Sequence, residues 1–251
     1  MSEVVFFLRS LLFYTGYAAF TVVWGTLSLL IAWALPFHLR FSFIIQVWTR
    51  VILFWLRITC GIRFQIEGLE NIPGQAAIVL AKHESTWETL ALQQLFSPQA
   101  TIVKRELLRI PFFGWAFALL KPIAINRNER RRALRELVEK GQRRLADNIW
   151  VLLFPEGTRS DPGVVLPFQA GAGLLAKASD RPVIIVAHDA GRCWPARQFI
   201  KRPGCITLII DKPLPVEGLD TKGILRAAEE RMRALAAQLY PDLPEGNHAA
   251  G

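Results

Sequence analysis

Hydrophobic and polar residues change their spacing along the chain at about residue 60. From Leu11 to Leu35 no residue carries a charge, and these 25 residues exceed the roughly 20 that a helix needs to cross a bilayer. A signal peptide fits poorly, because its apolar core would be shorter and no basic cluster precedes this stretch. The pattern predicts a membrane-associated helix.

The next stretch, residues 41–57, has apolar residues on one helical face and polar residues on another. Such an amphipathic helix either lies among lipid headgroups or packs its polar face on the rest of the protein. A second full span is disfavoured, because it would bury Arg50 in hydrocarbon. The apolar positions at helical spacing are Phe41, Ile44, Ile45, Trp48, Ile52 and Trp55.

From about Arg63, short apolar runs alternate with longer amphipathic ones. This alternation predicts an α/β fold with a mixed, largely parallel central sheet flanked by helices, behind an N-terminal hydrophobic helix pair. We expect membrane-associated helices over 1–60, an α/β domain over 61–245 and a disordered tail over 246–251. The expected strands are 63–68, 76–81, 100–104, 122–126, 149–154, 183–187 and 205–210. The expected helices are 86–96, 111–120, 129–147, 170–178 and 221–239.

Composition narrows the class of protein. The chain is 52% hydrophobic with 30 Lys and Arg against 21 Asp and Glu, which favours anionic lipid or anionic substrates. No nucleic-acid-binding motif accompanies the basic residues, so a nucleic-acid partner is disfavoured. The charges that follow the first apolar segment are arginines, which places the bulk of the chain in the cytoplasm. Cysteine and histidine spacing predicts reduced thiols and no metal site.

The segment "KHESTWET", residues 82–89, follows the expected strand 76–81. Residues five apart on one helix point about 140° away from each other. His83 can therefore meet Glu88 only from the corner before the helix. Ser85 to Glu88 also matches a capping box, so Glu88 has a structural interpretation as well. In the functional one, Glu88 accepts from Nδ1–H and leaves Nε2 of His83 as a general base.

A second candidate loop, "FPEGTRS", follows the strand 149–154. We expect it to expose Glu156 to substrate hydroxyls and Arg159 to a phosphate, with Gly157 permitting a tight turn. An ordinary turn with a surface ion pair is the alternative. Lys104 and Arg127 directly follow two other expected strands and are candidate phosphate ligands.

Together these motifs resemble the glycerolipid acyltransferase family, most closely the bacterial lysophosphatidic acid acyltransferases. The resemblance rests on His83 to Glu88, "INR" at 125–127, "FPEGTRS" at 154–160 and "RPVIIV" at 181–186. It implies acyl transfer from acyl-CoA or acyl carrier protein to the sn-2 hydroxyl of 1-acyl-sn-glycerol-3-phosphate. That reaction makes phosphatidic acid for phospholipid biosynthesis, without a cofactor.

The same resemblance implies roles for individual residues and a location. His83 would be the base and Glu88 its partner. Lys104, Arg127 and Arg159 would hold the phosphate, and the loop residues Glu156, Gly157 and Thr158 would contribute to acceptor binding. The location would be the cytoplasmic side of a bacterial inner membrane, with the N-terminal helices docked on one leaflet or spanning it.

Three positions depart from the family pattern: Glu88 and Asn126 each replace an Asp, and Ile185 replaces a proline. Two alternatives therefore stay open. One is an acyltransferase for another acceptor, such as glycerol-3-phosphate or a lyso-ornithine-type lipid. The other is a non-catalytic membrane adaptor that keeps the fold.

Overall fold

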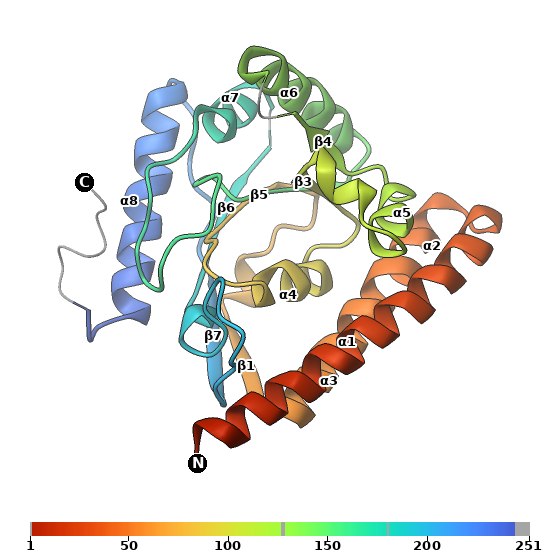
Figure 1. The fold of residues 1–251 in the computed structure, drawn as a ribbon. Helices are drawn as coiled ribbons and strands as arrows, with labels where there is room; N and C mark the ends of the chain where they lie inside the picture. Colours follow the sequence, from red (N-terminus) through yellow and green to blue (C-terminus); the bar gives the residue numbers. More distant parts are fainter. Residues whose placement is uncertain (1, 127–128, 180, 244–251) are drawn as a thin grey trace.

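A computed structural model describes residues 2–126, 129–179 and 181–243. Its seven strands form one sheet in the order β1-β7-β6-β2-β5-β3-β4, with helices on both faces (Figure 1). The strands are β1 (Ile62–Glu67), β2 (Ile78–Ala81), β3 (Gln99–Lys104), β4 (Ile123–Ile125), β5 (Trp150–Leu153), β6 (Val183–His188) and β7 (Gly204–Ile210).

Five neighbouring strands, β6, β2, β5, β3 and β4, run parallel to one another. Strand β7 pairs antiparallel with β6 and parallel with β1, so the sheet is mixed and largely parallel, as predicted. The carboxyl ends of the five parallel strands meet at one edge of the sheet. In such sheets ligands bind beyond this edge.

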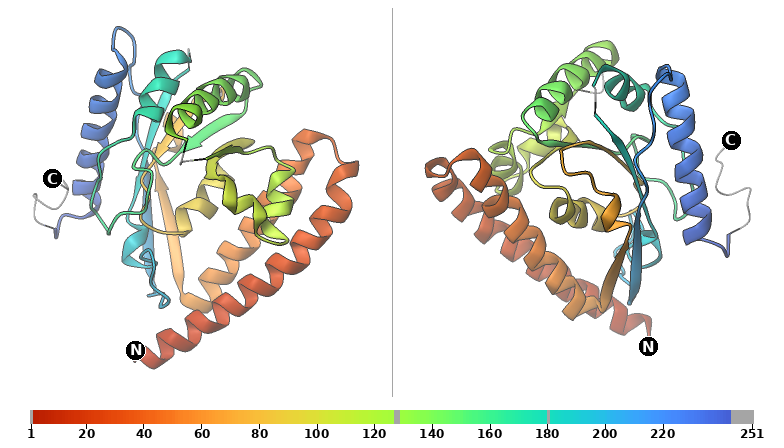
Figure 2. Two further views of the ribbon diagram at one scale, coloured as in Figure 1. Left: turned by 45° about the horizontal axis from the view of Figure 1, so that its top comes forward. Right: turned by 180° about the vertical axis from the view of Figure 1, so that it is seen from behind.

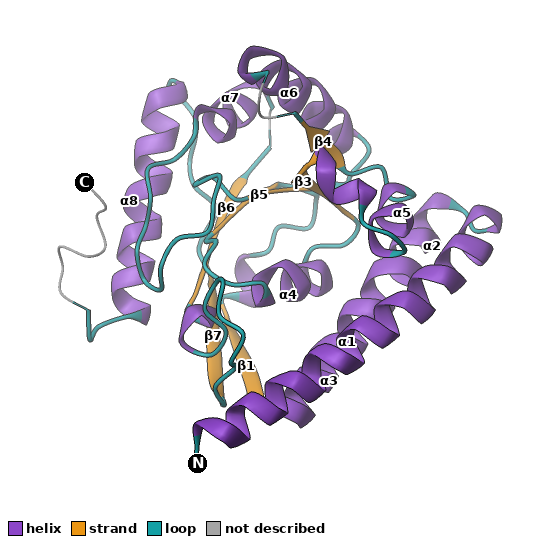
Figure 3. Ribbon diagram, viewed as in Figure 1, coloured by secondary structure: helices purple, strands orange, loops and turns teal. Residues whose placement is uncertain are grey.

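Alternating residues of the buried strands face two separate cores. Val79 of β2 belongs to one core and Leu80 to the other. Helices α3 (Val47–Cys60) and α4 (Trp87–Leu95) cover the first face. Helices α6 (Arg130–Ala146), α7 (Ala170–Ala178) and α8 (Thr221–Leu239) cover the second (Figures 2 and 3). Both faces are therefore buried, which explains why the strands read as unbroken apolar runs.

Close packing between α6, α7 and α8 depends on small residues. A Cβ atom on Gly173 of α7 would lie 2.7 Å from the carbonyl oxygen of Thr221, at the start of α8. On the other side, a Cβ on Gly141 of α6 would lie 2.7 Å from Leu175. Glycine at these two positions lets the three helices form one layer.

The N-terminal segment is a helical hairpin. Helix α1 (Glu3–Ile31) ends in a short turn, η1 (Ala32–Ala34), and the chain returns through α2 (Phe37–Phe41), η2 (Ser42–Gln46) and α3. By length and composition, both arms are apolar enough to cross a membrane. The most hydrophobic window of the first arm is only 17% buried and that of the second is 44% buried. The first arm thus leaves most of its apolar surface exposed.

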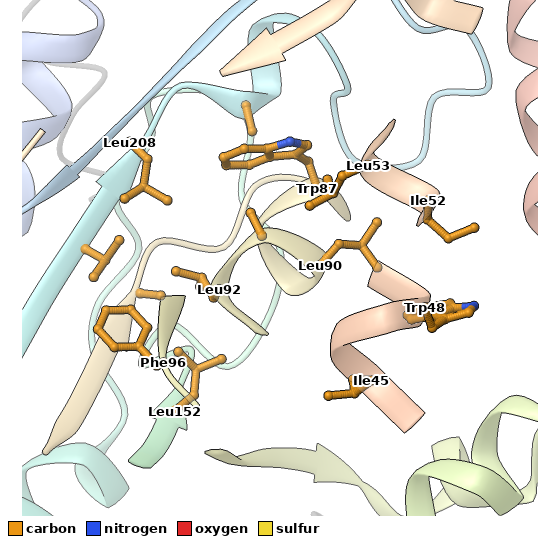
Figure 4. Close-up of a cluster of buried hydrophobic side chains, with 14 of the residues drawn as sticks. Ile45, Trp48, Ile52, Leu53, Trp87, Leu90, Leu92, Phe96, Leu152 and Leu208 are labelled. Atoms are coloured by element: carbon orange, nitrogen blue, oxygen red, sulfur yellow. The ribbon is translucent and has the colours of Figure 1, made fainter. Parts of the chain in front are cut away.

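The second arm packs on the protein through its apolar face, whereas the sequence suggested packing through its polar face. That apolar face lies against α1 and α4. Thr49, from the expected polar face, is also buried and lies beside Gln94 of α4. Figure 4 shows buried apolar side chains that the two helices contribute to the core. The labelled side chains are Ile45, Trp48, Ile52, Leu53, Trp87, Leu90, Leu92, Phe96, Leu152 and Leu208.

The expected elements of the α/β region are confirmed, with helix and strand ends shifted by at most two residues. Helix α5 (Phe113–Ala118) and two short turns, η3 (Leu69–Asn71) and η4 (Arg105–Arg109), lie between strands, and η5 (Ala190–Arg192) follows β6. All three cysteines are free thiols, as predicted. The proposed domain boundaries stay a prediction, and the expected tail over 246–251 lies outside the described residues.

Candidate active site

His83 lies at the corner between β2 and α4, as the spacing requires. Its Nδ1 atom is 2.7 Å from Oε1 of Glu88, at the start of the helix. The same oxygen accepts from the backbone N–H of Ser85 at 3.2 Å. The hydroxyl of Ser85 accepts from the N–H of Trp87 at 3.1 Å. Glu88 therefore has both the capping contact and the contact with histidine.

The ring of His83 is held on its face as well as at its edge. Phe154, the first residue of the "FPEGTRS" loop, stacks on it with ring centroids 4.0 Å apart and an interplanar angle of 19°. The His83 side chain is 15% exposed, whereas that of Glu88 is fully buried. The sequence reasoning gave Phe154 no role, although it lies within the quoted motif.

Burial raises the pKa of Glu88 to about 7, and the charges of His188 and Arg159 oppose that shift. The hydrogen bonds from His83 and Ser85 also favour the ionised form. An ionised carboxylate can only accept, so Nδ1 of His83 then carries the proton and Nε2 carries the basic lone pair. The arrangement can accept a proton at Nε2 and stabilise the resulting imidazolium.

The expectation that the loop exposes Glu156 is wrong. Its side chain is fully buried and forms an ion pair with Lys82, at 3.0 and 3.2 Å from Nζ to the two carboxylate oxygens. Lys82 is itself 1% exposed and also contacts the Ser160 hydroxyl. A carboxylate enclosed in this way does not face the solvent side of the loop.

The rest of the loop keeps a partly exposed cation beside the His83 corner. Arg159 donates through Nε to the carbonyl oxygen of Ser85 at 2.9 Å. Burial raises the pKa of Tyr14 and Tyr17 of α1, and the charge of Arg159 opposes that rise. Thr158 is exposed. Gly157 has a φ of 74°, a conformation that favours glycine. The loop thus turns tightly between the buried Glu156 and Arg159, which lies near α1.

The other two candidate cations lie on strands further along the sheet. Lys104 is the last residue of β3, which is the second strand from β2 in the sheet order. Neighbouring strands are about 4.8 Å apart, so its backbone is roughly 10 Å from the end of β2. Arg127 follows β4 in the sequence, but it lies outside the described residues.

Sequence reasoning missed a buried anchor next to the candidate base. Glu84 accepts from the Tyr240 hydroxyl at 2.6 Å, from Gly191 N–H at 2.9 Å and from Gly163 N–H at 3.0 Å. Burial raises the pKa of Glu84, and these donors oppose that shift. A charged residue between His83 and Ser85 was the signal in the sequence for this anchor. Its partners were not predictable, because they are distant in sequence.

His188, the other histidine considered as a base, is fully buried and has a different role. Its Nδ1 accepts from Ala190 N–H at 3.3 Å, and its Nε2 lies 3.0 Å from the carbonyl oxygen of Lys82. Desolvation lowers its pKa. Both ring nitrogens therefore form hydrogen bonds with the backbone and stabilise the corner. Within residues 2–126, 129–179 and 181–243, no cluster of three or more His, Cys, Asp or Glu could hold a metal.

Known proteins are similar to this chain in sequence. The sequence model of the Acyltransferase family matches residues 63–189. The 1-acyl-sn-glycerol-3-phosphate acyltransferase of Pseudomonas aeruginosa is 44% identical over 91% of this chain and 88% of its own length. The Saccharomyces cerevisiae protein of the same name is 30% identical over 70% of this chain and 59% of its own length.

A solved structure agrees in fold. The crystal structure of the 1-acyl-sn-glycerophosphate acyltransferase PlsC from Thermotoga maritima superposes with a TM-score of 0.79 and 25% identity, over 95% of this chain and 99% of that chain. The residues matched by the family model run from β1 to just past β6 and include the His83 corner and the "FPEGTRS" loop. The chain belongs to the Acyltransferase family and is an O-acyltransferase.

Proposed function

We propose that this protein transfers a fatty acyl group from an acyl thioester to the sn-2 hydroxyl of 1-acyl-sn-glycerol-3-phosphate, forming phosphatidic acid. One observation carries the proposal: a solvent-accessible imidazole is hydrogen bonded to a buried carboxylate at the carboxyl edge of the sheet. The names of the similar proteins from bacteria and yeast support this acceptor.

In the proposed step, Nε2 of His83 takes the proton of the sn-2 hydroxyl while its oxygen attacks the thioester carbonyl carbon. A C–O ester bond forms, the C–S bond breaks, and the imidazolium returns the proton to the departing thiolate. Glu88 stabilises the imidazolium and holds the ring in one orientation. The Ser85 hydroxyl donates to the Trp194 carbonyl oxygen and accepts from Trp87 N–H, so it is not placed to act as a nucleophile. The proposed transfer is therefore direct and forms no acyl-enzyme.

The acceptor phosphate would bind to cations along the sheet edge. Arg159 is the best supported, because it is partly exposed and hydrogen bonded to the corner that holds His83. Lys104 and Arg127 are proposed as further phosphate ligands, and Gly157 and Thr158 as loop residues near the glycerol. The acyl donor would be acyl-CoA or acyl carrier protein, with no metal or cofactor.

We place the reaction at the cytoplasmic face of a bacterial membrane. Helix α1 supplies the apolar surface, with exposed residues that include Leu8, Leu12 and Leu30. The arginines after the first segment favour the cytoplasmic side. The exposure of Arg50 and Arg57 on α3 supports a hairpin docked on one leaflet.

The test incubates purified protein with lysophosphatidic acid and a labelled acyl thioester, and analyses the product by mass spectrometry. Label should appear in phosphatidic acid at the sn-2 position, and His83→Ala should abolish the reaction. A panel containing glycerol-3-phosphate and a lyso-ornithine lipid tests the other acceptors. Faster turnover of either one would replace the proposed substrate. No transfer to any acceptor in this panel would mean that the acceptor of this acyltransferase lies outside the panel.

A further inference from the structure

We propose that Lys82 and Glu156 are positioning residues: their buried ion pair sets the distance between His83 and Arg159, and Glu156 does not contact the acceptor. This inference rests on the proposed function. It assigns a role to Lys82, for which the sequence motifs predicted none, and it changes the role expected for Glu156.

The Glu156 carboxylate has its partners inside the protein. Oε1 accepts from Lys82 Nζ at 3.0 Å and lies 3.4 Å from the backbone nitrogen of His83. Oε2 accepts from Lys82 Nζ at 3.2 Å and from Leu166 N–H at 3.2 Å. Each oxygen therefore has two donors, and none of them is on the exposed side of the loop.

The chemistry of the acceptor leads to the same conclusion. 1-Acyl-sn-glycerol-3-phosphate has one unesterified glycerol hydroxyl, which is the one that reacts at His83. A carboxylate has no second hydroxyl to bind, and it would repel the phosphate. Neutralising Glu156 with Lys82 leaves the positive charge of Arg159, three residues further on, available for the anionic acceptor.

The ion pair lies between the two parts of the site that must stay in register. Beyond Glu156, the backbone N–H of Ser160 donates to the carbonyl oxygen of His83 at 2.9 Å. Arg159 donates to the carbonyl oxygen of Ser85 at the same distance. The loop is thus hydrogen bonded to the corner at His83 and at Ser85. A displacement of about 1 Å in such an arrangement can lower turnover about 100-fold.

A double-mutant cycle tests the proposal in the full-length protein. Lys82→Met and Glu156→Gln each remove one charge at nearly constant volume and leave the other charge buried without its partner. Removing both charges restores neutrality. We expect each single variant to lose about 100-fold in kcat. The double variant should recover to within about 10-fold of wild type, with a higher Tm than either single variant.

Direct contact between Glu156 and the acceptor predicts a different pattern. Glu156→Gln and the double variant would then be equally impaired, mainly through a higher KM for lysophosphatidic acid, and Lys82→Met would keep most of its kcat. Equal impairment of Glu156→Gln and the double variant would overturn the proposal, and so would a Lys82→Met variant that keeps most of its kcat. If Lys82→Met does not fold, the comparison of Glu156→Gln with the double variant decides by itself, because only positioning predicts recovery.

Two controls separate this inference from loss of stability and from the proposed function. Met232→Ala creates a cavity at a fully buried position of α8 and should lower Tm without changing kcat well below the melting temperature. Wild-type transfer to lysophosphatidic acid establishes the reaction itself. Transfer by wild type without recovery in the double variant refutes only the positioning role, whereas an inactive wild type refutes both.

Discussion

At the scale of single residues, Glu88 makes both the structural and the functional contact that the sequence suggested. One carboxylate oxygen accepts from Ser85 N–H, as in a capping box, and from His83 Nδ1. The structural contact fixes where the oxygen lies, so the helix start itself orients the imidazole. The other oxygen has no hydrogen-bond partner among the described residues and lies 3.8 Å from His188 Nε2.

Glu88→Gln should separate the two contacts. The amide oxygen can accept from both Ser85 N–H and His83 Nδ1–H, as carboxylate oxygen Oε1 does, but the neutral amide does not stabilise the imidazolium that forms at His83. We expect kcat to fall roughly 10- to 100-fold, because a hydrogen bond to a charged group contributes about 1.5–3 kcal/mol, with no loss of Tm. Glu88→Asp, which keeps the charge, should retain far more activity. Near-normal turnover in Glu88→Gln would remove Glu88 from the mechanism.

The raised pKa of Glu88, about 7, predicts how activity and stability change with pH. Protonated Glu88 cannot stabilise an imidazolium, so kcat/KM should fall as pH decreases below about 7. Stability changes in the opposite direction. A folded-state pKa above the unfolded value of about 4.3 stabilises the fold at low pH, and this contribution is lost as pH rises through 7.

Thermal unfolding of Glu88→Gln across pH checks that sign. The variant lacks the buried charge, so its Tm relative to wild type should be higher at pH 8 than at pH 5. The parallel measurement is the pH profile of kcat/KM for wild type. A Tm difference that is constant across this range would mean that Glu88 does not titrate there.

Arg159 allows a test of phosphate recognition. Arg159→Ala should raise KM for lysophosphatidic acid roughly 10- to 100-fold, because a charge-assisted hydrogen bond contributes about 1.5–3 kcal/mol. Arg135→Ala removes an equal charge from the exposed face of α6 and should leave KM unchanged. An unchanged KM in Arg159→Ala, or an equal rise in both variants, would contradict a specific phosphate contact.

At the scale of secondary structure, the sequence predicted the sheet well because its central strands β2, β5 and β6 are buried on both faces. Runs such as Val183–His188 are unbroken and end at clear turns. Strand order and side-chain pairing across long distances were not predictable. Lys82 and Glu156 are 74 positions apart, and β2 and β5 become neighbours only in the folded sheet. The apolar face of α3 was misassigned because periodicity identifies a face but not what covers it.

Gly173→Val tests the close contact between α7 and α8. The added Cβ would lie 2.7 Å from the Thr221 carbonyl oxygen and 2.7 Å from Leu225, so the helices must separate. We expect a loss of about 1–3 kcal/mol in the free energy of unfolding by denaturant. Gly74→Val is the matched control, because no atom lies within 4 Å of its added Cβ. Equal stability in both variants would mean that this packing is not limiting.

At the scale of the whole molecule, the two N-terminal arms divide their surfaces between protein and lipid. The apolar face of α3 completes the core over α4, whereas α1 packs one narrow face on α3 and leaves large apolar residues exposed. Small residues permit this approach: a Cβ on Gly16 would lie 2.3 Å from the Trp55 indole. Loop residue Lys201 joins α1 to the α/β region through Tyr14, at 2.6 Å. The exposed side of α1 is therefore held in a fixed relation to the catalytic edge.

This arrangement predicts that α1 controls access to membrane-embedded substrate. Leu12 on α1 and Leu69 on the α/β region have similar exposed fractions, 53% and 50%, and so form a matched pair for substitution by glutamate. Leu12→Glu should reduce binding to anionic phospholipid vesicles roughly 10-fold or more, because it places a charge in the apolar surface. Its turnover of lysophosphatidic acid dispersed in detergent should stay near wild type. Leu69→Glu should change neither quantity, and equal loss of vesicle binding in both variants would show that α1 is not the membrane-contacting surface.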